Sequence, residues 1–110
     1  MADQLKILGQ LDAAATTTEI LYTTPSLVLT TVSSLVICNR TAASLTFRVS
    51  VHAADSSPDD KQFIFYDTPL AANSTLTTVI GITLSEGDLV KTYASATGMS
   101  FNLYGVETSR

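Results

Sequence analysis

The chain has 110 residues and a net charge of −4, a length typical of a single domain. Nucleic acids and anionic membranes attract clustered Lys and Arg, but the six basic residues are scattered along the sequence, so we expect neither partner. Only 15% of the residues are charged, and Ser and Thr take the place of charge. Such a surface favours a protein that is partly covered by copies of itself or by a larger assembly.

The N-terminal segment, residues 1–18, is predicted to form a strand and a candidate docking arm, followed by a β-sandwich domain over residues 19–110. Its low-complexity run L-D-A-A-A-T-T-T, residues 11–18, fits an arm that docks on a neighbour or an ordered surface loop. The first residues lack the apolar stretch of a secretory signal, and no run reaches the ~20 apolar residues of a membrane span. We therefore expect synthesis in a reducing cytoplasm.

Strand patterns dominate the first half of the chain. T-E-I-L-Y-T predicts a strand that ends at Pro25, and the apolar run over residues 26–39 is long enough to bend near Ser33 and Ser34. In S-L-T-F-R-V-S-V-H, residues 44–52, apolar and polar side chains alternate. This alternation predicts a half-buried strand whose solvent-exposed face carries His52.

The second half continues in the same way. Four further segments predict strands: K-Q-F-I-F-Y-D, S-T-L-T-T-V-I-G-I-T, D-L-V-K-T-Y-A and M-S-F-N-L-Y-G-V-E. Gly81 indicates a bulge, whereas Gly87 and Gly98 supply left-handed positions in turns. With no helical stripe in the sequence, the fold class is predicted to be all-β, a single-domain antiparallel β-sandwich, jelly-roll-like, with eight or nine strands.

Catalytic chemistry is sparse. His52 is the only histidine and Cys38 the only cysteine, so a nucleophile–histidine triad would have to use His52, and no zinc site of ordinary composition can form. Neither glycine-rich phosphate-binding motif occurs. We expect no enzymatic activity and no cofactor.

Two sets of residues are candidates for binding. Asp55, Asp59 and Asp60 crowd one loop and could hold Ca²⁺ through carboxylate oxygens, although solvated acidic turns of this kind are common. The tyrosines combine apolar area with a polar tip, which suits interface contacts as well as strand-edge or core positions; they are Tyr22, Tyr66, Tyr93 and Tyr104.

Two family resemblances add to this reading. L-x-x-G-D-x-V-x-x-Y followed by S-F-x-x-x-G, within residues 84–105, resembles the closing strands of small trimeric jelly rolls of the complement and tumour-necrosis-factor type. Over nearly the whole chain, the succession L-Y-T-T-P, T-V-S-S-L-V-I-C-N-R, T-F-R-V-S-V, F-I-F-Y-D and S-F-N-L-Y-G-V-E resembles small virion structural proteins of tailed phages, including cyanophages.

The second resemblance implies a role in the virion. It implies a capsid decoration (cement) protein that associates with itself, as a homotrimer, and binds the major capsid protein or other virion proteins on the head exterior. A tail-fibre, baseplate or neck component of the virion is the alternative that the same resemblance leaves open. A carbohydrate-binding module for host recognition is a third reading, which would use the tyrosines or the loop of Asp55, Asp59 and Asp60.

Overall fold

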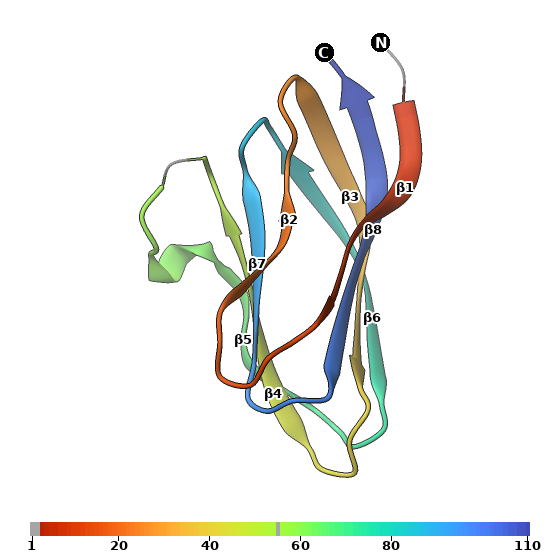
Figure 1. The fold of residues 1–110 in the computed structure, drawn as a ribbon, viewed down its shortest axis with the longest axis vertical. Helices are drawn as coiled ribbons and strands as arrows, with labels where there is room; N and C mark the ends of the chain where they lie inside the picture. Colours follow the sequence, from red (N-terminus) through yellow and green to blue (C-terminus); the bar gives the residue numbers. More distant parts are fainter. Residues whose placement is uncertain (1–2, 55) are drawn as a thin grey trace.

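The computed structural model describes residues 3–54 and 56–110, which form two packed antiparallel sheets (Figure 1). The eight strands are β1 (Asp3–Asp12), β2 (Glu19–Thr23), β3 (Val28–Asn39), β4 (Leu45–His52), β5 (Phe63–Leu70), β6 (Thr75–Leu84), β7 (Leu89–Ala94) and β8 (Met99–Ser109). A single 3₁₀ turn, η1 (Asp60–Gln62), lies between β4 and β5. No helix in these two ranges is long and apolar enough to cross a membrane.

The strand order identifies the fold as a jelly roll. One sheet has the order β1-β8-β3-β6 and the other β2-β7-β4-β5. Strands pair as in one long hairpin folded over on itself: β1 with β8, β2 with β7, β3 with β6 and β4 with β5. Additional pairing of β3 with β8 and of β4 with β7 closes the roll. The predicted all-β, jelly-roll-like sandwich is confirmed, with eight strands.

Alternating side chains fill the space between the sheets. Phe47 of β4 lies against Phe101 of β8, with ring centroids 6.3 Å apart, and against Phe65 of β5 at 5.5 Å. Because β4 and β8 belong to different sheets, this aromatic contact joins them. Burial of such rings removes large apolar areas from water, so Phe47 and Phe101 lie at the centre of the core that the alternation predicts.

The predicted irregularities occur where the sequence indicates them. The register of β3 against β6 shifts between Val32 and Ser34, opposite the stretch of β6 that contains Gly81. Gly87 and Gly98 have φ angles of 84° and 106°, left-handed values that glycine adopts without steric cost.

One segment agrees with the expected arrangement and one differs. The predicted N-terminal strand is β1, an edge strand of its sheet that pairs with β8, and docking of residues 11–18 on a neighbour stays a prediction. His52 was expected on a solvent-exposed face, which is wrong: only 6% of the residue is exposed. The reason is that the connection from β4 to β5 folds back over the outer face of β4, so that Pro58 and Gln62 line the same pocket as His52.

Candidate functional site

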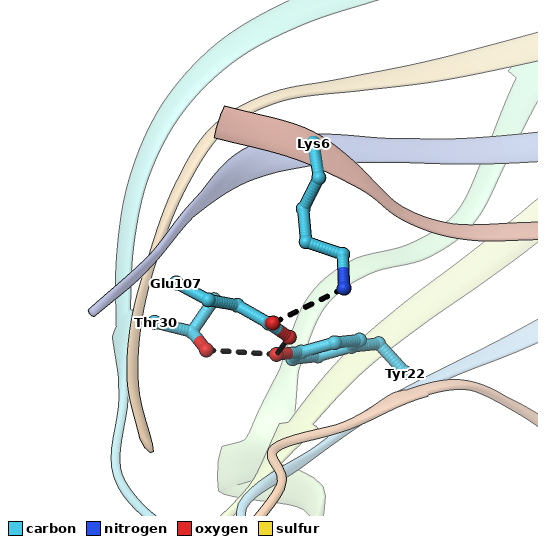
Figure 2. Close-up of polar contacts among 4 residues, drawn as sticks. All are labelled: Lys6, Tyr22, Thr30 and Glu107. Atoms are coloured by element: carbon cyan, nitrogen blue, oxygen red, sulfur yellow. Dashed lines mark hydrogen bonds and ion pairs between the residues drawn. The ribbon is translucent and has the colours of Figure 1, made fainter. Parts of the chain in front are cut away.

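A polar cluster lies between the sheets at the end of the molecule near both termini (Figures 1 and 2). Glu107 of β8 accepts a hydrogen bond of 2.5 Å from the Tyr22 hydroxyl of β2, and its other oxygen is 3.2 Å from Lys6 Nζ of β1. The Tyr22 hydroxyl is also 2.8 Å from Thr30 Oγ1 of β3. Four strands from the two sheets therefore meet in one cluster of polar contacts.

The cluster is satisfied within the chain. Glu107 and Tyr22 are both buried, and burial together with the hydrogen bond to Glu107 raises the pKa of Tyr22 to about 12. A buried carboxylate needs such partners because an unpaired one would be costly. Tyr22 therefore has the core position that the sequence left open as the alternative to an interface contact.

A second cluster brings Tyr66 and Tyr93 together on the outer face of the other sheet. The Arg48 guanidinium lies between their rings, 4.3 Å from the Tyr66 centroid and 4.5 Å from the Tyr93 centroid. Arg48 also donates two hydrogen bonds to the Asp67 carboxylate, at 2.6 and 3.2 Å. The hydrogen bonds with Asp67 raise the pKa of Arg48 and lower the pKa of Asp67.

Beside this cluster is a pocket of about 340 Å³, bounded by β4, β7 and the loop before β5. Ser50 Oγ and His52 Nε2 are 2.7 Å apart along its floor. Burial, with a smaller contribution from the Lys91 charge, lowers the pKa of His52, so the imidazole is neutral at neutral pH.

A hydroxyl beside an imidazole supplies two of the three groups of a catalytic triad. No carboxylate that orients the imidazole is found among the described residues. Asp59 lines the pocket, yet its carboxylate accepts from the backbone N–H of Lys61 and caps η1. Ser50 is itself buried. The Ser50–His52 pair thus fits a role in supporting the loop that covers it.

The acidic loop does not assemble a cation site in the part of the chain that the structure describes. Asp59 is the N-cap of η1 and Asp60 lies in its first turn, while Asp55 lies outside the described residues. Among those residues, no three His, Cys, Asp or Glu side chains come close enough together to hold a metal ion.

On the outer face of the β1-β8-β3-β6 sheet, charged residues lie only on β1, where Asp3 and Asp12 are opposite Thr108 and Ser100 of β8. β3 and β6 contain no charged residue, and the single charged residue of β8, Glu107, points inward. Tyr104 lies on this face, opposite Ile7 of β1 in the register of the sheet. We call the part of this surface between Asp3 and Asp12 the uncharged face; it is represented by Leu5, Ile7, Thr31, Val79, Tyr104 and Val106.

Sequence reasoning missed the Glu107 cluster although the sequence contains a signal for it. The apolar positions of the last strand, Met99, Phe101 and Leu103, continue with period two to Gly105 and Glu107. A charged residue at an inward position predicts a buried, partnered carboxylate. Its partners could not be named, because Tyr22 is 85 residues away in the chain.

Comparison with known proteins identifies a fold relationship. No protein-family profile and no curated protein matches the sequence. A chain in the structure of infectious bursal disease virus strain Gx matches with a TM-score of 0.55 and 11% identity, over 98% of this chain and 32% of that chain. A chain of the T13 particle of the same virus matches with a TM-score of 0.53 and 11% identity, over 96% and 30%.

These likenesses show the fold. The present chain spans about a third of the length of either viral chain, so they compare one β-sandwich with one part of a larger protein. The identity of 11% leaves the tailed-phage family of the sequence resemblance unconfirmed.

Proposed function

We propose that this protein is a virion structural protein without catalytic activity, and specifically a capsid decoration protein that binds the exterior of the head and stabilises it. The observation that carries the proposal is the likeness of nearly the whole chain to chains of a virus particle. The sequence resemblance to small virion proteins of tailed phages points the same way.

The surface chemistry supports a role that depends on shape. Two buried polar pairs, Tyr22 with Glu107 and Ser50 with His52, are formed inside the chain. Few exposed residues are charged, and the outer face of one sheet is free of charge on β8, β3 and β6 and is partly apolar. Such a face is compatible with packing in a lattice, where depletion of charge at the centre of a contact is usual.

The mechanism follows from binding linkage. A protein that binds only the assembled shell stabilises that shell by the free energy of binding, which grows with the logarithm of its concentration relative to Kd. Many copies on a symmetric surface would therefore raise the temperature or internal pressure at which the head opens. No strained or reactive group is needed for this effect.

The test is reconstitution on heads that lack this protein. Purified protein is added to the heads of a phage that encodes it, with tailed particles in a parallel sample, and DNA release is followed during heating. We expect the release temperature of the heads to rise upon addition. Binding that requires tails would assign the protein to the tail or neck, and glycan binding without binding to particles would favour the carbohydrate-binding module.

A further inference from the structure

We propose that the uncharged face of the β1-β8-β3-β6 sheet is buried against a second copy of this chain. This inference deepens the proposed function and rests on it, because it names the surface through which copies in a virion would meet. It concerns contacts between copies in solution, so it can be tested without virus particles.

The first step is the absence of charge. The three strands β8, β3 and β6 together present no Asp, Glu, Lys or Arg on this face, and the carboxylates of β1, Asp3 and Asp12, lie at its two ends. On the opposite side of the molecule, the outer face of the second sheet carries Arg48, Asp67 and Lys91. Since the chain has a net charge of −4, the uncharged face is the surface where two copies can approach with the least repulsion.

The second step is the position of the apolar side chains. Leu5 is 84% exposed at one edge of the sheet and Val79 is 88% exposed at the other. One row of paired residues crosses all four strands, from Ile7 through Tyr104 and Ser34 to Val79. Apolar groups therefore extend across the whole width of the face, as a packed sheet requires.

The third step is the edge of the sheet. β6 (Thr75–Leu84) is an edge strand of ten residues without charge or proline, although edge strands ordinarily carry such groups to prevent pairing with other chains. The other edge, β1, carries Asp3, Lys6 and Asp12. Val79 lies on this edge strand beside the register shift at Gly81, so an edge without charge borders the uncharged face.

The area is sufficient for a specific contact. Four strands at ~4.8 Å spacing and roughly ten residues at ~3.3 Å each give a face of about 600 Å². Two such faces together would bury about 1,200 Å², within the range of specific interfaces. The same face of a second copy has the same area, presents no like charge that would repel the first copy, and has the pleated shape that packs on a sheet.

The experiment measures the mass of the full chain by sedimentation over a hundredfold range of concentration. We expect an oligomer that dissociates on dilution, and we expect Val79→Lys to raise the dissociation constant at least tenfold, because it places a charge in the contact. The matched control is Ile20→Lys, which changes another exposed isoleucine (54%) on β2 of the second sheet and should leave the mass unchanged. Circular dichroism establishes that both variants are folded.

A second measurement needs no substitution. Cys38, the only cysteine, is paired with Ser100 and Thr75 in the same face, so its labelling by a maleimide should slow as protein concentration rises. A monomer at all concentrations, or an oligomer dissociated by Ile20→Lys and not by Val79→Lys, would overturn the inference. Because particles are absent from this assay, either result leaves the reconstitution on heads as a separate test of the proposed function.

Discussion

At the scale of single residues, the Tyr22 hydroxyl is the group on which the end of the sandwich depends. It donates a hydrogen bond to the Glu107 carboxylate and contacts Thr30, and Lys6 is the second partner of that carboxylate. Glu107 is buried, with 9% of the residue exposed. Removing this hydroxyl leaves the carboxylate with one partner fewer in a buried site. We expect Tyr22→Phe to lower the free energy of unfolding by about 1–3 kcal/mol, measured by urea denaturation at neutral pH.

The same residue predicts an alkaline limit of stability. The pKa of Tyr22 is raised from 10.0 to about 12 in the folded protein, so the folded state holds this proton more tightly than the unfolded state. The resulting stability is complete below pH 10 and is lost as pH rises through about 12. Wild type should therefore lose more stability than Tyr22→Phe over this interval; parallel curves for the two proteins would contradict the assignment.

The buried His52 makes the stability of the fold sensitive to acidic pH. Burial and the Lys91 charge lower its pKa below 6.5, so the unfolded state takes up a proton that the folded state resists. Stability is then present above pH 6.5 and declines as pH falls toward the lowered pKa. Urea denaturation at about pH 7.5 and about pH 5 should show a smaller loss for His52→Asn than for wild type. Asp59 and Arg48 also line this pocket and are unchanged in the variant.

At the scale of elements, close approach of backbones fixes how β8 lies against β3. A Cβ atom added at Gly105 would lie 2.2 Å from the carbonyl oxygen of Thr31, and backbone would have to move to admit it. We expect Gly105→Ala to destabilise the fold by about 1–3 kcal/mol, the usual cost of overpacking.

Gly81 is the matched control for this prediction. It also lies in a strand of the same sheet, but an added Cβ would meet nothing within 4 Å. Gly81→Ala should change the free energy of unfolding by less than about 0.5 kcal/mol. The two variants are compared by thermal or urea denaturation. An equal loss of unfolding free energy in both would contradict the prediction that the close approach of β8 to β3 excludes a side chain at Gly105.

The positions of the strands could be predicted from the sequence better than the pairing between them. Alternation in residues 45–51 and 99–103 locates β4 and β8, and Gly87 and Gly98 lie in left-handed turns as their local sequence predicts. Pairing of β1 with β8 joins segments from opposite ends of the chain, and register of this kind depends on contacts that no local pattern records. For the same reason His52 was placed in solvent, since the loop that covers it could not be seen.

At the scale of the whole molecule, the two outer faces have different chemistry. One carries the Arg48, Tyr66 and Tyr93 cluster with a pocket beside it, and the other is the uncharged face with apolar groups at both edges. Composition already indicated a surface covered by an assembly, because so little of it is charged. Which side would be covered required the strand order, since the four strands of the uncharged face are far apart in sequence.

The most direct test of the account is the number of copies bound per particle. Heads that lack the protein are saturated with it, sedimented and analysed by quantitative mass spectrometry. A decoration protein predicts hundreds of copies on each head, with or without tails. Absence of the protein from saturated heads and from complete particles alike would contradict its assignment as a virion structural protein.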